Sequence, residues 1–269
     1  MAVTISHPAV VVPLRRIGLI LSALVVGSLI PDFEFFFSLS DGRLIAHTIP
    51  GIFIFCIPVG FIILLIFHKL IKNPLMSLLP HSHQSRLYPV VKEFKFLPVS
   101  NLIKIVISLF FGIISHLVWD GFTHADGWFV QHIPVLSKAL LVTPWGILRG
   151  YFALQYISSV FAVLLMVYWY KKWFSATAPV KNVIVHKFRL GRRIGIGFLF
   201  TGFSILAGVS YGFLTVKNFD TTAMVKNFIA HTSIASVSGL MLALVLFGII
   251  WHFLIPHHKR VVIKQSDLE

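Results

Sequence analysis

The chain consists largely of long apolar runs without charged side chains. The run from Ile49 to Phe67 is one example, and similar runs recur along the chain. A helix needs about 20 apolar residues to cross a hydrocarbon core about 30 Å thick. Apolar and polar residues do not alternate here, as they would in the strands of an outer-membrane barrel. With 57% hydrophobic and 12% charged residues, a soluble domain is excluded, and we predict an all-α, polytopic transmembrane helical bundle.

The spacing of these runs predicts six spans. The first has 14 residues and would cover about 21 Å of the core, so the residues after it would lie slightly below the far surface. Residues 68–100 and 120–149 are expected to be connecting loops, the second of them partly along the membrane interface. The predicted spans are Ile17–Ile30, Ile49–Phe67, Leu102–Trp119, Tyr151–Tyr170, Ile194–Val216 and Ser233–Ile255.

These spans predict three regions along the chain. Residues 1–175 would form a membrane-embedded domain of four spans that carries the candidate metal site. Residues 176–193 would be a basic cytoplasmic loop, and residues 194–269 a two-span extension with a basic tail.

The basic residues predict the orientation of the bundle. Of the 23 Lys and Arg residues, 18 fall on one side of the six-span arrangement. Because such an excess marks the cytoplasmic side, we expect both termini to lie in the cytoplasm. The basic residues are scattered over four segments without a nucleic-acid motif, so no nucleic-acid partner is expected. The single cysteine, Cys56, excludes a disulfide framework and a cysteine metal site.

Residues 115–126, SHLVWDGFTHAD, place ionisable side chains at the end of the third apolar run. On a helix, His116 and Asp120 share one face and can converge on a single ion. His124 would lie about 12 Å from His116 along a continuous helix. It can join the same ion only if the helix ends near Gly121; otherwise a second ion would be required.

Span counting places further acidic and imidazole side chains on the membrane face that receives this motif. Imidazole and carboxylate ligands can hold zinc or another divalent ion that activates water for hydrolysis. Glu34 and Asp126 are candidate catalytic carboxylates: Asp126 could orient a ligand or act as a general base, and Glu34 is also a candidate ligand. The candidate metal ligands from the pattern are Asp32, His47, His116, Asp120 and His124.

Each of these residues also has a structural interpretation. Asp32 and Glu34 are compatible with capping the first span, and His47, followed by Thr48 and Pro50, is compatible with a helix start. His116 differs, because it lies within an apolar span, where an imidazole without a partner is costly.

Four sequence motifs strengthen the functional interpretation. SHPAVVVPLRR, GSLIPDFEFF, AHTIPG and SHLVWDGFTH closely resemble a family of bacterial integral membrane proteins classified as a domain of unknown function, over residues 6–170. That family is similar to predicted membrane-bound metal-dependent hydrolases and, more remotely, to the ligand helix of zinc-dependent phospholipase C. The resemblance implies a divalent ion, zinc in the remote relatives, with Glu34 standing where the hydrolase pattern has Asp. The ligands it implies are His7, Asp32, His47, His116 and Asp120.

His7 can reach the other ligands only if the N-terminal chain turns back. Ser6, His7 and Pro8 are typical of a helix start, with Ser6 or His7 as the cap. A continuous helix from Pro8 to Ile30 would be about 35 Å long and would place His7 across the membrane from Asp32.

The sequence is therefore compatible with three functions. A metal-dependent hydrolase at the outer membrane surface, acting on a membrane lipid or a phosphoester, uses every candidate residue. A transporter or channel would use the same residues as an ion pathway, and a structural membrane protein would use them only to cap helices.

Overall fold

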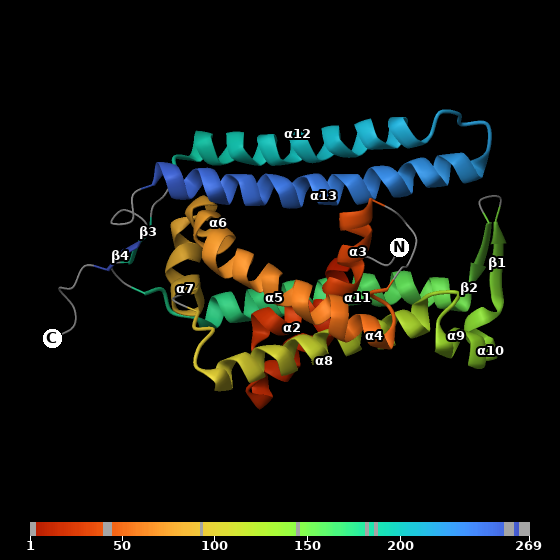
Figure 1. Ribbon diagram of the computed structural model, residues 1–269, viewed down its shortest axis with the longest axis horizontal. Helices are drawn as coiled ribbons and strands as arrows, with labels where there is room; N and C mark the ends of the chain where they lie inside the picture. Colours follow the sequence, from red (N-terminus) through yellow and green to blue (C-terminus); the bar gives the residue numbers. More distant parts are fainter. Residues whose placement is uncertain are drawn as a thin grey trace. The chain divides into compact units, whose positions relative to one another are not determined.

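The computed structural model describes residues 4–39, 45–91, 94–143, 146–180, 183–185, 188–255 and 261–263. These residues are predominantly helical (Figure 1), which confirms the predicted all-α class. Five helical segments are long and apolar enough to cross a membrane, and a sixth crossing is possible if the bent pair α2 and α3 counts as one span. The five segments are Ile49–Leu78, Val99–His132, Gly150–Ala176, Leu190–Thr215 and Thr222–Leu254.

The elements follow one another with few strands among the described residues. The α-helices are α1 (Pro8–Val11), α2 (Leu21–Gly27), α3 (Ile30–Ser38), α4 (Ile49–Gly51), α5 (Ile57–Ile66), α6 (Lys72–Leu78), α7 (His81–Val91), α8 (Val99–Thr123), α9 (Trp128–His132), α10 (Pro134–Ser137), α11 (Gly150–Ala176), α12 (Leu190–Thr215) and α13 (Thr222–Leu254). The antiparallel pairs are β1 (Ala139–Thr143) with β2 (Gly146–Arg149), and β3 (Val183–Val185) with β4 (Val261–Ile263).

The chain forms two compact units that alternate along the sequence. The first comprises Met1–Phe33, Leu44–Leu64 and Lys95–Trp173, and the second comprises Glu34–Arg43, Leu65–Phe94 and Phe174–Glu269. The three-part division predicted from the apolar runs stays a prediction.

In the first unit, α2 packs closely against α8. Gly27 and Gly112 lie at the contact, and a Cβ atom at either position would meet backbone atoms of the other helix. Small residues let helix backbones approach in this way inside a membrane. Ser108 Oγ accepts a hydrogen bond of 2.9 Å from the Ile20 backbone N–H, at the start of α2. A buried cluster continues this core with Ile30, Ala46, Ile52, Cys56 and Ile113.

The N-terminal segment is a hairpin rather than the continuous helix considered above. After α1, residues Val12–Ile17 form a 3₁₀ helix. Pro13 disrupts this short helix less than it would disrupt a long α-helix, because no extended hydrogen-bond ladder is required there. Gly18 then adopts φ +85°, a left-handed conformation that glycine reaches without strain, and α2 runs back. Within the predicted first span, α2 covers only Leu21–Gly27, and α3 begins at the last residue of that span, Ile30, at an angle of 51° to α2. The N-terminal hairpin, residues 8–30, thus returns the chain toward His7.

The expected loop at residues 68–100 is largely helical, which corrects the sequence prediction. Two π-helical segments, Ile52–Cys56 and Phe67–Ile71, precede Pro58 and Pro74. A proline removes one helical hydrogen bond and clashes with the carbonyl four residues earlier, and a wider π turn moves that carbonyl away. The helical path therefore continues to Leu78. The expected loop at 120–149 likewise contains α9, α10 and the β1–β2 hairpin.

In the second unit, α12 and α13 form a long antiparallel hairpin whose helices lie side by side (Figure 1). Gly208 and Gly212 of α12 lie against Ser236 and Thr232 of α13. The Ser204 hydroxyl also donates a 2.7 Å hydrogen bond to the Ser236 carbonyl. Small residues and interhelical hydrogen bonds are the contacts expected to hold helices together in lipid.

The close contact of α2 and α8 predicts that Gly112→Ala destabilises the protein by about 1–3 kcal/mol, because the added methyl group overpacks a backbone contact. Gly197→Ala on α12 is the matched control, since a Cβ atom there meets nothing within 4 Å. The control should be neutral or stabilising by up to about 1 kcal/mol. Thermal unfolding in detergent, followed by circular dichroism, measures both. Equal effects of the two substitutions would contradict the packing described here.

Candidate metal centre

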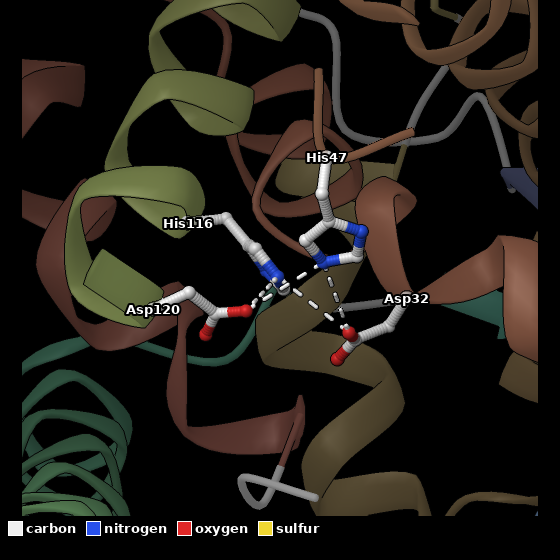
Figure 2. A group of neighbouring side chains, drawn as sticks. All are labelled: Asp32, His47, His116 and Asp120. Carbon is white, nitrogen blue, oxygen red and sulfur yellow. Dashed lines mark ion pairs between the residues drawn. The ribbon is translucent and has the colours of Figure 1, made fainter. Parts of the chain in front are cut away.

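Four side chains from three segments of the first unit converge on one point (Figure 2). Asp32 comes from the first turn of α3, His47 from the turn before α4, and His116 and Asp120 from one face of α8. One donor atom from each residue lies within 4.8 Å of all the others. The spacing of four residues in α8 and the span counting for Asp32 and His47 thus identified side chains that meet.

The spacing of these donor atoms fits a metal ion better than a closed hydrogen-bond network. His116 Nε2 lies 3.5 Å from both Asp32 Oδ1 and Asp120 Oδ2, and His47 Nε2 lies 3.9 and 3.6 Å from the same two oxygens. These separations exceed the range of about 2.7–3.2 Å for an N–H···O hydrogen bond. Ligands bound tetrahedrally at about 2.0–2.1 Å are about 3.3–3.4 Å apart. The buried group could therefore hold a metal ion after a small contraction.

Surrounding groups orient two of the four donors. His116 Nδ1 is 2.8 Å from the Ser28 carbonyl, so Nδ1 carries the proton that is donated and Nε2 faces the carboxylates. The Thr4 hydroxyl donates a 2.6 Å hydrogen bond to Asp32 Oδ2 and leaves Oδ1 facing the imidazoles. Hydrogen bonds of this kind orient metal ligands in many sites.

Asp120 connects the four-residue group to two further imidazoles. Its Oδ2 faces His47 and His116, whereas its Oδ1 lies 3.8 Å from His7 Nε2 and 3.4 Å from His124 Nδ1. His7 is 1% exposed and stacks on His116, with 4.1 Å between ring centroids. The hairpin described above brings it there, and its side chain does not cap α1. Burial first, and then His116, lower the pKa of His7 to about 4, so its imidazole is neutral at pH 7.

His124 follows the last residue of α8, Thr123, and lies beside Asp120, four residues earlier in the chain. The backbone at His124 is extended, with φ −116° and ψ 146°. The helix thus ends two residues after Gly121. His124 supplies no donor atom to the four-residue group, and its role as a metal ligand stays a prediction. His124 remains partly exposed, at 23% of its side chain.

The two candidate catalytic carboxylates lie differently. Asp126 is exposed in the turn between α8 and α9, where its backbone carbonyl accepts a hydrogen bond from Gln131. Glu34 is buried but belongs to the second unit. Two residues after Asp32, it lies about 200° around the helix from it. Neither carboxylate supplies a donor atom to the four-residue group, and their catalytic roles stay predictions.

The sequence did not predict the buried polar residues of α11, one of which contacts the N-terminal segment. Ser159 Oγ lies 3.3 Å from Ser6 Oγ, next to His7. Gln155, one turn earlier on the same helix, is 5% exposed, and its Nε2 makes no hydrogen bond to any residue that the structure describes. The signal was present in the sequence as polar residues four apart within an apolar span.

Fold and site together define a multi-pass membrane protein with a buried Asp/His group that could hold a metal ion. Residues 1–249 match the model of a family described as a domain of unknown function, DUF4184, and the chain belongs to that family. No curated protein and no solved structure matches the chain.

The hydrogen bond from Thr4 predicts an effect on metal binding. Thr4→Val keeps the shape of the side chain but leaves Asp32 Oδ2 without its donor, so the affinity of the candidate site for a divalent ion, tested with Zn²⁺, should fall about 10–100-fold. Thr201→Val, which removes a hydroxyl that bonds only within α12, serves as the control. Competition with a zinc chelator measures both affinities. Unchanged affinity in Thr4→Val would show that this hydroxyl does not orient a metal ligand.

Proposed function

We propose that the protein is a metal-dependent hydrolase of the bacterial inner membrane that acts on a lipid or phosphoester. The observation that supports this most directly is the set of four buried donor atoms, whose separations suit metal ligands and exceed hydrogen-bond lengths. Capping alone would not bring Asp32, His47 and His116 to one point. A purely structural role is therefore less well supported.

Zinc is the ion that we propose for this site. Imidazole nitrogen and carboxylate oxygen are common zinc ligands, and the group contains no thiolate. A bound divalent ion would polarise a phosphoryl or acyl oxygen and lower the pKa of water. The site lies among apolar spans, where such electrostatic effects are weakly screened.

The residues around the ligands have distinct parts in this proposal. The Ser28 carbonyl orients the His116 ring through Nδ1, and the Thr4 hydroxyl fixes the direction of Asp32. His124 is the partly exposed imidazole at the edge of the cluster, and its Nδ1 is 3.4 Å from Asp120 Oδ1. It is therefore the group best placed to exchange a proton between the site and water.

We also propose a five-span topology that revises the predicted orientation. Thr4 and His7 contact Asp32 and Asp120 directly, so the N-terminal hairpin need not cross the membrane. With the cluster on the outer side, the start of the chain lies outside and the five long segments lead to a cytoplasmic C-terminus. The basic segments after Leu78 and Ala176 then still lie in the cytoplasm, in agreement with the charge rule.

The metal proposal predicts that the purified protein holds about one divalent ion per chain and that His116→Ala and Asp120→Ala remove it, because each deletes a donor atom. His132→Ala is the matched control: that imidazole is exposed and its Nδ1 bonds the Trp128 carbonyl within α9. Elemental analysis gives the metal content. Chelation should abolish hydrolysis of a phospholipid or p-nitrophenyl phosphate, and added Zn²⁺ should restore it.

Two outcomes would contradict the hydrolase proposal. Wild-type protein without stoichiometric metal would remove its basis. If Asp32→Asn abolished ion transport by the reconstituted protein while the metal content stayed intact, the transporter would be the better assignment. A transporter would be favoured by ionisable residues deep within several spans. Among the described residues, the spans Leu190–Thr215 and Thr222–Leu254 contain no cluster of His, Asp or Glu side chains like the one in the first unit.

The five-span proposal predicts that an epitope tag at the N-terminus is accessible to protease in intact spheroplasts, whereas a tag at the C-terminus is protected. A six-span arrangement predicts protection of both tags. Lysed spheroplasts, in which both tags should be cleaved, control for tag exposure.

A further inference from the structure

An apolar pocket of about 470 Å³ lies in the first unit. Its walls come from α8, from the start of α11 and from the N-terminal hairpin, with Ile114, Val118, Leu154 and Leu14 among the lining residues. No charged side chain lines it. The volume lies within the range of about 300–1,000 Å³ that is typical of ligand pockets.

Two residues connect this pocket to the metal centre. Trp119 lines the pocket, and its ring centroid is 5.7 Å from that of His7 in an edge-on contact. Thr123 also lines the pocket, and its Oγ1 is 3.4 Å from His124 Nδ1. One end of an otherwise apolar pocket is therefore bounded by residues that contact the imidazoles beside Asp120.

Trp119 also offers an unused hydrogen-bond donor at this end. Its Nε1 is buried and makes no hydrogen bond to any described residue. Buried indole N–H groups usually have a partner. A ligand oxygen between the pocket and the cluster would supply one.

The chemistry of the pocket selects among possible occupants. A polar soluble molecule would find no charged group along the walls. A transmembrane helix about 10 Å wide would fill this volume with little more than one turn. An acyl chain is apolar and thin, and the surrounding bilayer supplies it. Because the bilayer is as apolar as the pocket, shape and the polar end must provide the selectivity.

We propose that the pocket binds one acyl chain of a lipid whose head group reaches the His/Asp cluster. In this arrangement the Trp119 N–H donates a hydrogen bond to an ester or phosphate oxygen of the lipid. This inference rests on the proposed hydrolase function and defines its substrate class as a membrane lipid.

Filling the pocket tests the inference. Val118→Trp places a large side chain in the pocket wall, and Val106→Trp makes the same change on the same helix outside the pocket. The two valines are similarly exposed, at 47% and 40%. The protein is reconstituted in nanodiscs with a phospholipid that carries a photoactivatable diazirine on one acyl chain. Wild-type protein and Val106→Trp should crosslink at residues 111–123 or 154–158, and Val118→Trp should lose this labelling several-fold.

A second pair of variants and the metal content separate the possible failures. Leu154→Trp, with Leu164→Trp as its control on α11, repeats the test on the other wall. The acyl-chain site would be overturned if both pocket variants were labelled as strongly as wild type, or if the control variants lost as much labelling as the pocket variants. Either result would leave the metal proposal standing. Wild-type protein that is labelled in the pocket but contains no metal would overturn the hydrolase and support the chain site alone. If all variants keep their metal, the pocket variants should hydrolyse long-chain lipid more slowly and p-nitrophenyl phosphate at an unchanged rate. That result supports both the acyl-chain site and the hydrolase.

Discussion

The burial of two carboxylates among apolar helices is the constraint on which the first unit depends. A charged oxygen removed from water is costly unless other groups compensate it. Among the described residues, Asp32 has imidazoles and the Thr4 hydroxyl as partners, and no Lys or Arg. Compensation thus requires segments distant in sequence to meet. The N-terminal hairpin, the close contact of α2 with α8 and the end of α8 at Thr123 each bring a polar group to this point.

Asp120 has a particular place in this arrangement because its two oxygens face different pairs of imidazoles. Oδ2 belongs to the four-residue group, and Oδ1 faces His7 and His124. One carboxylate thereby links the deepest imidazoles to a partly exposed one at the edge. The apolar pocket is lined by Trp119 and Thr123, which contact His7 and His124, the two imidazoles that Oδ1 faces.

Residue spacing and the ends of the apolar runs predicted the four residues that meet at the site. His116 and Asp120 follow from their separation of four residues, and Asp32 and His47 from the ends of apolar runs. The position of His7 could not be predicted in this way, because it depends on the left-handed backbone at Gly18 and on the 3₁₀ segment before it. The helix through Leu78 was missed for a similar reason. Pro74 indicates a helix break, unless a π turn relieves its clash with the preceding turn.

The N-terminal hairpin also constrains the order in which the protein can be assembled. Its return at Gly18 brings residues 4, 7 and 32 together, but their partners at 116 and 120 are synthesised more than 80 residues later than Asp32. During insertion, the Asp32 carboxylate must therefore stay near water until α8 enters the bilayer. The hairpin can take its final place only after α8, formed by the third apolar run, has entered the membrane. A completed site therefore requires that the first unit is correctly inserted.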